Sequence, residues 1–492
     1  MRNVIEFILN GEIKRIDALD PTLTVLRYLR EIERLTGSKE GCAEGDCGAC
    51  TAVVADIQSG GLRYRAVNTC IQLVGMLDGK ALITIEHLKT DHHLHPVQQA
   101  MVDHHASQCG FCTPGFVMSL FAGYQEELKP ERNVIDTLLA GNLCRCTGYT
   151  AIINAAEKAL GPRVGKNCFA ARERQLIEQL RQIKHGEDVH VESDGRRYIA
   201  PNSIDKLARL LRRYPKATLV AGATDVGLFV TKQHRRLDTL IDLGKVKELA
   251  RISHNKNGLR LGAAVTYESA QPELAALYPG LNELIRRLGS VQVRNLGTIG
   301  GNIATASPIG DMPPALIAAG ATLRLRQGSE TREIPLEDFF ISYGRQDRRP
   351  SEFVESVYIP KPKAHGILKV YKVSKRFDQD ISSLCGAFHL TFDNAAGPRK
   401  ISSARICFGG MAGTPLRARD CEQFLVGKRW SEDIAAEAAC ILKNEYEPIS
   451  DWRASADYRI AAAGNLLRRF LLETTTGKDL QLAGHQEVVH AY

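Results

Sequence analysis

Alternating and helically spaced apolar residues in the first 90 positions predict a small sheet packed on a helix. Residues 4–17 alternate on both sides of Asn10-Gly11, and an Asn-Gly pair is typical of a two-residue hairpin turn. Residues 23–35 repeat apolar side chains at the spacing of an amphipathic helix. Strand-like runs follow at residues 51–57 and 81–86.

Longer apolar periods predict helices in the next part of the chain. Residues 113–128 and 148–160 are apolar and helix-like, and Pro114 fits the preference for proline in a first helical turn. Residues 164–195 are charged, with one short helical pattern, and we interpret them as a linker. A new domain then begins at residue 196, where Ser203 can cap a helix.

The remainder mixes strands and helices. Residues 217–222 form a short apolar run typical of a buried strand. From residue 366 onward, three strand-like runs precede two helical patterns at 431–446 and 457–473. The whole chain is therefore expected to be a multidomain α+β protein.

Composition excludes several classes of protein. A chain of 492 residues with 44% apolar and 24% charged residues is ordinary for three globular domains. The net charge of +8 is spread over the chain without a long Lys/Arg run, so we expect no nucleic-acid partner. No apolar stretch approaches a membrane span, and the N-terminus lacks a signal-peptide pattern. We expect no membrane association and a cytoplasmic location.

Eight of the thirteen cysteines form two sets of four, each spaced like the ligands of an iron–sulfur cluster. The first set is Cys42, Cys47, Cys50 and Cys70. Its C-x4-C-x2-C pattern with one distant cysteine is the plant-type spacing for [2Fe–2S]. Gly41, Gly45 and Gly48 would let the loop curl so that three thiolates point inward. A zinc site or a disulfide pair is the alternative.

The second set joins a C-x2-C pair to a C-x-C pair. It consists of Cys109, Cys112, Cys144 and Cys146. The C-x2-C pair alone also suits zinc or a redox dithiol. Both pairs precede helix-like stretches, however, and helix N-termini favour the negative charge of a thiolate-bound cluster. A cluster at the junction of two helix starts is therefore plausible beside the zinc alternative.

Two glycine-rich stretches suggest a cradle for a dinucleotide. Residues 219–227 place small residues between a strand and an apolar helix, where backbone N–H groups can face phosphate. Residues 293–314 contain Gly297, Gly300 and Gly301, which permit close backbone approach. Neither stretch is a G-x-G-x-x-G fingerprint, so a Rossmann NAD site has no support. Taken alone, each could also be a glycine-rich turn.

The cysteine motifs GCAEGDCGAC, QCGFCTPG and GNLCRCTGY together resemble the molybdenum hydroxylase family, which includes xanthine dehydrogenase, aldehyde oxidase and carbon monoxide dehydrogenase. The resemblance implies a β-grasp plant-type ferredoxin domain, an all-α [2Fe–2S] helical domain, a two-part α+β FAD-binding domain and a C-terminal α+β flavoprotein subdomain. It also places the plant-type cluster nearer the flavin, and Gln108 against a pterin. The expected boundaries, linker included, are 1–86, 87–163, 164–195, 196–365 and 366–480.

The resemblance also assigns FAD-binding residues. The first segment would wrap the diphosphate, the second would complete the pocket, and Asp311 would reach the far end of the FAD. Lys372 matches a lysine at the flavin site, Val354 a hydrophobic contact, and Leu288 a position where some relatives carry an aromatic residue. The two segments consist of Leu219, Val220, Ala221, Gly222, Ala223, Thr224, Asp225 and Val226, and of Thr298, Ile299, Gly300, Gly301, Asn302, Thr305 and Ser307.

The resemblance implies partners as well as cofactors. The family's molybdenum-binding portion is far larger than what remains here, so no catalytic residue is expected in this chain, and substrate would bind a large molybdopterin-bearing subunit in a heterotetramer of two small and two large chains. The layout is similar to the small subunit of bacterial xanthine dehydrogenases. Electrons from hypoxanthine or xanthine would pass through two [2Fe–2S] clusters to FAD and then to NAD. The alternatives are a relative acting on another N-heterocycle, an aldehyde or an acyl-CoA, and a stand-alone redox carrier or sensor.

Other reactive residues have simpler explanations. Six of the fourteen histidines lie between His87 and His105, and we expect surface or packing roles rather than a metal site. The remaining cysteines are scattered singly and are expected to be buried, inert thiols. They are Cys168, Cys385, Cys407, Cys421 and Cys440.

Overall fold

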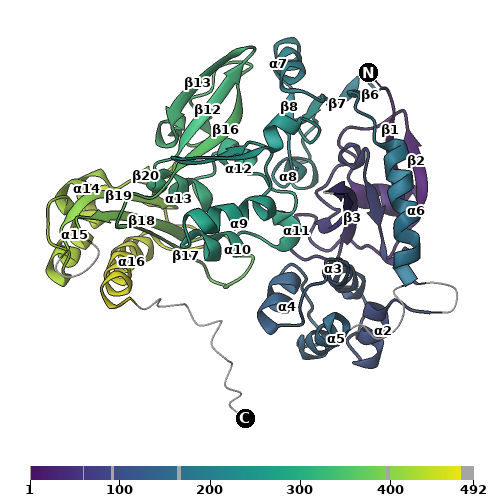
Figure 1. Ribbon diagram of the computed structural model, residues 1–492, viewed down its shortest axis with the longest axis horizontal. Coiled ribbons are helices and arrows are strands. Elements are labelled where there is room, and N and C mark those ends of the chain that lie inside the picture. Colours follow the sequence, from purple (N-terminus) through teal and green to yellow (C-terminus); the bar gives the residue numbers. More distant parts are fainter. Residues whose placement is uncertain (1, 59, 90–92, 163–167, 395–398, 478–492) are drawn as a thin grey trace. The chain divides into compact units, whose positions relative to one another are not determined.

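The computed structural model describes residues 2–58, 60–89, 93–162, 168–394 and 399–477 (Figure 1). The chain forms two compact units. Unit 1 contains Met1–Glu248 and Gly289–Gly297, and unit 2 contains Leu249–Leu288 and Thr298–Tyr492. The region predicted to bind FAD, 196–365, therefore contributes to both units.

The N-terminal sheet of unit 1 has the strand order β2-β1-β5-β3-β4, in which β1 and β5 are parallel. This parallel pair between the first and last strands gives the β-grasp arrangement. Leu9 pairs with Glu12, so Asn10 and Gly11 form a two-residue turn with φ of 52° and 90°, and the predicted hairpin is confirmed. The strands are β1 (Ile5–Leu9), β2 (Glu12–Ile16), β3 (Thr51–Gln58), β4 (Gly61–Asn68) and β5 (Ala81–Ile83).

The helix predicted over residues 23–35 differs in form. Only α1 (Val25–Arg27) is α-helical, and Tyr28–Ile32 is π-helical. The Glu33 N–H donates to the Tyr28 carbonyl, and the buried Tyr28 hydroxyl donates to the Glu33 carboxylate. This local pairing accompanies the wider turn, which apolar spacing alone does not distinguish from an α-helix.

A group of four helices follows the N-terminal sheet in unit 1, and these helices lie together in Figure 1. The central helix is α3, which is buried from Gly115 to Tyr124 and packs against the other helices and β3. The predictions for residues 113–128 and 148–160 are confirmed by α3 and α5. The helices are α2 (Pro96–Asp103), α3 (Thr113–Gln125), α4 (Arg132–Leu139) and α5 (Thr150–Leu160).

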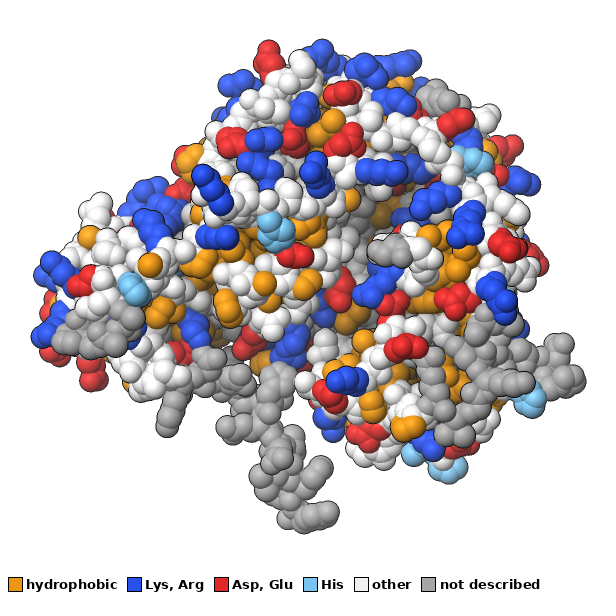
Figure 2. Space-filling view, viewed as in Figure 1, with side chains coloured by type: hydrophobic (Ala, Val, Ile, Leu, Met, Phe, Trp, Pro, Cys, Tyr) orange, Lys and Arg blue, Asp and Glu red, His pale blue; other side chains and the backbone are white. Residues whose placement is uncertain are grey.

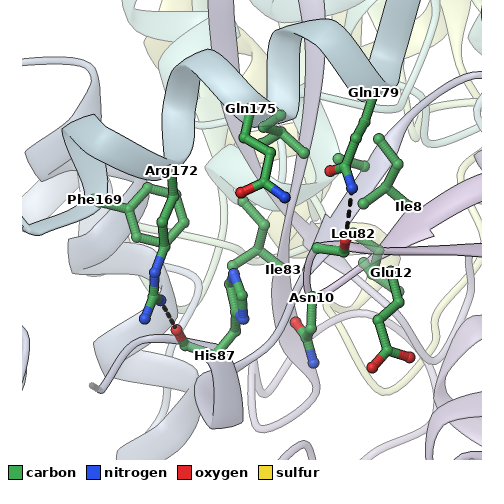
Figure 3. Close-up of a pocket in the computed structure, with 13 residues that line it drawn as sticks. Ile8, Asn10, Glu12, Leu82, Ile83, His87, Phe169, Arg172, Gln175 and Gln179 are labelled. Carbon is green, nitrogen blue, oxygen red and sulfur yellow. Dashed lines mark hydrogen bonds between the residues drawn. The ribbon is translucent and has the colours of Figure 1, made fainter. Parts of the chain in front are cut away.

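Much of the stretch interpreted as a linker is folded. Helix α6 (Cys168–Ile183) lies along β1, and it borders a cavity of about 270 Å³ (Figure 3). Its Arg172 Nη1 donates to the His87 carbonyl at 2.8 Å, and Gln179 Nε2 donates to the Gly11 carbonyl at 2.9 Å. The apolar face of α6, which includes Leu180, covers the sheet; its short helical pattern was visible in the sequence, but its docking was not.

A second, four-stranded sheet completes unit 1, with the order β6-β7-β9-β8 and parallel pairing of β7, β9 and β8. Ser203 Oγ accepts from the Lys206 N–H, so the predicted cap is confirmed. The elements are β6 (Val189–Ser193), β7 (Arg196–Ala200), α7 (Ile204–Arg213), β8 (Thr218–Val220), α8 (Val226–Thr231), β9 (Thr239–Asp242) and α11 (Val291–Arg294).

Unit 2 begins with a five-stranded antiparallel sheet of order β10-β11-β16-β12-β13. Helices α12 and α13 pack near β16. The elements are β10 (Ile252–Asn255), β11 (Gly258–Gly262), α9 (Tyr267–Leu277), α10 (Leu281–Arg286), α12 (Ile299–Thr305), α13 (Met312–Ala319), β12 (Thr322–Gln327), β13 (Glu330–Pro335), β14 (Phe340–Ser342), β15 (Arg345–Gln346) and β16 (Phe353–Pro360).

The other sheet of unit 2 has the order β17-β18-β19-β20 and is antiparallel. Its core includes stacked Phe388 and Phe470, so α16 covers one face. The predicted strands and both predicted helices are present. The elements are β17 (Gly366–Val373), β18 (Leu384–Phe392), β19 (Ile401–Gly409), β20 (Leu416–Arg417), α14 (Arg419–Leu425), α15 (Glu432–Glu445) and α16 (Ala456–Thr476).

Charges of both signs are interspersed on the face shown in Figure 2. Among the described residues, no helix combines the length and apolar character that crossing a lipid bilayer requires.

Candidate redox centres and flavin segments

The loop that carries the first cysteine set curls around the Cys42 sulfur. The N–H groups of Glu44, Asp46 and Cys47 each donate to Cys42 Sγ at 3.4 Å. Gly48 has a φ of +69°. Gly41 is needed for another reason: it lets the Cys47 sulfur approach the backbone closely, because a Cβ on Gly41 would lie 2.8 Å from Cys47 Sγ.

The four thiols of this set fit a two-iron cluster. Cys42 is hydrogen-bonded to Cys47 and Cys70, and these bonds hold the pKa of Cys42 well below its usual range. The Cys50 thiol in turn lies beside the free Cys70 thiol, and both are buried. A [2Fe–2S] cluster takes two protein ligands on each iron. Cys42 with Cys47, and Cys50 with Cys70, would supply that arrangement.

The second cysteine set lies at the surface beside the start of α3. Cys112 immediately precedes this helix and lies beside the Cys144 thiol, whereas Cys109 lies beside the Cys146 thiol. All four thiols are free. The Cys144 N–H donates to the Tyr149 hydroxyl at 2.9 Å, one residue before α5. The thiols again form two pairs, as a two-iron cluster requires. Unlike the first set, this one is open: Cys109 and Cys146 are exposed.

The first flavin segment follows β8 and leads into α8. Ala223 adopts a φ of +60°, and a Cβ on Gly222 would lie 1.7 Å from the Leu296 carbonyl oxygen. Gly222 therefore serves packing within unit 1. Leu228 on α8 packs against a small apolar cluster of Leu26, Cys50, Cys70 and Ile71, so this segment leads directly to the buried cysteines of the first set.

The second flavin segment begins α12, where protein groups already use the first N–H groups. The N–H groups of Ile299 and Gly300 donate to the carbonyls of Val265 and Ala263, both at 2.9 Å. Thr298 Oγ1 caps the helix by accepting from the Gly301 N–H at 3.1 Å. The close approach that Gly300 permits here is to Ala263. Its role toward a cofactor stays a prediction.

One polar atom in the second segment fits a ligand. Asn302 Oδ1 is buried and has no hydrogen-bond partner among the described residues. A Cβ on Gly301 would meet only Thr298 Oγ1, at 2.8 Å, within 4 Å. Ser307 Oγ accepts from the Ile309 N–H at 3.4 Å, and Thr305 Oγ1 donates to the Gly301 carbonyl at 3.0 Å. Gly301 thus leaves space beside the helix start, and Asn302 offers an acceptor without a protein partner among the described residues.

Asp311 and Lys372 form a buried ion pair in unit 2. Lys372 Nζ lies 2.6 Å from Asp311 Oδ2, and Ser382 Oγ donates to Asp311 Oδ1 at 2.5 Å. Both carboxylate oxygens thus have a protein partner, and Asp311 orients Lys372. The resemblance places Asp311 at the far end of the FAD. The roles of both residues toward FAD stay predictions.

Arg287 is a positioning residue that the sequence did not indicate. Its buried guanidinium donates to the Lys372 carbonyl at 3.0 Å, to the Phe377 carbonyl at 3.0 Å and to Ser374 Oγ at 3.1 Å. It also lies over the Phe377 ring. One side chain therefore fixes both the backbone of Lys372 and the loop that follows β17. No local sequence pattern indicates this role, because the partners lie 85 to 90 residues away along the chain.

Three further residues named from the resemblance occupy different environments. Val354 is buried in β16, where it pairs with Leu325. Leu288 is half-buried after α10, and Gln108 is exposed beside Cys109. Their roles toward a cofactor stay predictions.

The histidine-rich segment has structural roles where the structure describes it; His92 lies outside the described residues. His95 caps α2 by accepting from the Val97 N–H and packs edge-on against Phe121 and Tyr124. Among the described residues of this segment, no three His, Cys, Asp or Glu side chains come together as they would around a single metal ion.

Acid should destabilise the fold through His95. Burial lowers the pKa of His95 to about 4 from 6.5. The unfolded chain therefore takes up this proton first, and stability is lost as pH falls from 6.5 to 4, by roughly 3 kcal/mol. Denaturant unfolding between pH 7 and 4 should show this loss, and it should be smaller in His95→Asn, which keeps a capping side chain. The exposed His105→Asn serves as control, and an equal pH dependence in both variants would contradict the assignment.

The single cysteines largely match expectation. Cys385, Cys407 and Cys421 are buried, and burial raises the pKa of each thiol. Cys440 is exposed, so that prediction was wrong. It lies on α15, whose buried face is formed by neighbouring residues such as Ala439. The Cys168 side chain lies outside the described residues.

Four family models match successive parts of the chain. The 2Fe-2S iron–sulfur cluster binding domain matches residues 7–71, and the [2Fe-2S] binding domain matches 84–157. The FAD binding domain in molybdopterin dehydrogenase matches 191–362, and the CO dehydrogenase flavoprotein C-terminal domain matches 369–474.

Curated relatives include the xanthine dehydrogenase of Emericella nidulans, 31% identical over 88% of this chain and 36% of that protein. Xanthine dehydrogenase 1 of Arabidopsis thaliana is 30% identical over 86% of this chain and 36% of that protein. This chain therefore spans about a third of the length of these relatives.

Two solved structures illustrate the similarity in fold. Carbon monoxide dehydrogenase from Hydrogenophaga pseudoflava has a TM-score of 0.52 and 28% identity, over 55% of this chain and 94% of that one. Quinoline 2-oxidoreductase from Pseudomonas putida 86 has a TM-score of 0.52 and 29% identity, over 57% of this chain and 96% of that one. Together with the four domain matches in this order, these similarities show that the chain belongs to the molybdenum hydroxylase family of oxidoreductases, as an iron–sulfur and FAD-binding electron-transfer component.

Proposed function

We propose that this chain is the electron-transfer subunit of a xanthine dehydrogenase, which oxidises hypoxanthine and xanthine to urate in purine catabolism. The names of the curated relatives support the substrate. The eight paired cysteines would hold two [2Fe–2S] clusters, and the two glycine-rich segments with the Asp311–Lys372 pair would hold FAD. When bound, the flavin converts single electrons into the hydride that NAD accepts.

One observation supports the direction of electron flow: the two cysteine sets have opposite surroundings. Cys50 and Cys70 are buried against α8, which follows the first flavin segment. The second set instead opens to solvent, where Phe111 and Leu143 are 45% and 43% exposed. An exposed apolar rim suits a protein partner. Electrons would therefore enter at the second set and leave from the first toward the flavin.

The partner would be a large molybdopterin-bearing subunit, in a heterotetramer of two small and two large chains. A single experiment tests the substrate and the acceptor together. The purified complex is supplied with NAD and, separately, with xanthine, nicotinate and an aldehyde, and NADH formation is followed. We expect NADH with xanthine; its absence would reject the xanthine assignment.

A second candidate is the same role in a relative with another substrate. The structural similarity to quinoline 2-oxidoreductase favours an N-heterocycle as the alternative. NADH formation with nicotinate but not xanthine would support it. Recovery of the chain from its native host without any large molybdopterin-bearing partner would instead support a stand-alone carrier.

A further inference from the structure

The two cysteine-bearing loops meet at a buried polar cluster within unit 1, which we call the Gln292 network. Its members come from β3, α3, the loop before Cys144 and α11, and each is at most 2% exposed. They are Thr51, Ser119, Asn142 and Gln292. Gln292 is brought here from 150 residues beyond Asn142, and no flavin or cysteine motif predicted its position.

Hydrogen-bond direction in the network is fixed. Thr51 Oγ1 donates to the Gly48 carbonyl at 2.7 Å, and Ser119 Oγ donates to Asn142 Oδ1 at 2.6 Å, so both hydroxyl protons are used. Asn142 Nδ2 donates to the Gly48 carbonyl at 3.2 Å.

Gln292 supplies the donor that the remaining acceptors need. Its Nε2 lies 3.1 Å from Ser119 Oγ, 3.1 Å from Asn142 Oδ1 and 3.4 Å from Thr51 Oγ1. All three atoms are acceptors toward it. Asn142 Oδ1 also accepts from Ser119 Oγ, and Thr51 Oγ1 also accepts from Asn142 Nδ2 at 3.3 Å. An oxygen in the place of Nε2 would therefore leave Ser119 Oγ without a donor and would face two further oxygens.

The network holds a direct bond between the two cysteine sets. The Leu143 N–H, next to Cys144, donates to the Cys47 carbonyl at 3.0 Å. Space at this point is minimal: a Cβ on Gly141 would lie 2.0 Å from Gln292 Oε1. A path that consists of backbone covalent bonds and this one hydrogen bond therefore connects Cys144 to Cys47, with no jump through space.

We propose that Gln292 is a positioning residue for electron transfer between the two cluster sites, because it holds Asn142 and thereby the Leu143–Cys47 hydrogen bond that joins them. The proposal rests on the electron-transfer role proposed above. The step moves one electron: the group held by the second cysteine set is oxidised, the group held by the first is reduced, and no bond or proton changes.

The test uses the purified full-length chain with its clusters. Gln292→Leu removes the donor at similar size, and Gln292→Glu is nearly isosteric and covers the case in which leucine prevents folding. Asn295→Ala is the matched control, because Asn295 fixes the same segment through the Ala66 carbonyl at 2.9 Å without touching the network. Two quantities are measured: hydrogen exchange of the Leu143 amide, and the splitting of each reduced [2Fe–2S] EPR signal by the other.

We expect both Gln292 variants to keep two EPR signals, to change their mutual splitting and to exchange the Leu143 amide about tenfold faster or more. Gln292→Glu should recover toward wild type at acidic pH, where a protonated carboxyl regains a donor. Asn295→Ala should resemble wild type. Unchanged exchange and splitting in folded Gln292 variants would overturn the inference and leave the proposed function standing. Absence of two [2Fe–2S] signals from the wild-type chain would overturn both.

Discussion

Replacing Gly48 with alanine is expected to disrupt both cluster sites at once and to lower the free energy of unfolding by about 3 kcal/mol or more. Gly48 has a φ of +69°, which alone costs alanine about 1–2 kcal/mol. A Cβ there would also lie 2.1 Å from the Gly141 carbonyl oxygen and 2.5 Å from Asn142 Nδ2. The first of these is backbone and cannot rotate away, so the two loops must separate.

Gly60 provides the matched control for this prediction. Its φ is +86°, and a Cβ on it would meet nothing within 4 Å. Gly60→Ala should therefore show only the backbone cost of about 1–2 kcal/mol and keep both [2Fe–2S] EPR signals. Denaturant unfolding and EPR of the two variants measure the difference. Equal destabilisation and intact signals in both would mean that contact between the loops does not govern this position.

Features encoded within a few residues were predictable from the sequence. The Asn10-Gly11 hairpin and the Ser203 cap depend on neighbours only, and both are present. The spacing of the cysteines likewise expresses a local constraint, since a short loop must bring three thiolates together. The π-helical turn at Tyr28–Ile32 was not predictable, because apolar spacing does not reveal how the Glu33 N–H is paired.

Contacts made across long separations escaped prediction. Gln292 reaches Thr51 across 241 positions, and Lys372 reaches Asp311 across 61. Neither pairing follows from periodicity, which reports only which face of an element is apolar. The glycines illustrate the same limit: Gly300 and Gly301 are adjacent, yet one packs against Ala263 while the other leaves space.

Gly301 therefore offers a clean test of the flavin segment. A Cβ on Gly301 would meet only Thr298 Oγ1 within 4 Å, so Gly301→Leu can fold. The loss of the Thr298 cap, about 1 kcal/mol, is offset by the better helix propensity of leucine over glycine. The leucine side chain would instead fill the space beside Asn302. We expect retained FAD to fall about tenfold or more while both [2Fe–2S] EPR signals persist.

Two further variants test whether the volume of the added side chain causes the loss of FAD. Gly301→Ala adds only a methyl group and should lose less FAD than Gly301→Leu. Gly300→Ala should behave differently, because its Cβ would lie 2.4 Å from Ala263 Cβ and 2.6 Å from Ala263 Cα, so it should destabilise unit 2 itself. FAD is measured by absorbance after gel filtration, beside the midpoint of denaturant unfolding. If folded Gly301→Leu kept stoichiometric FAD, the ligand would have to bind away from Gly301, and Asn302 would lose its proposed partner.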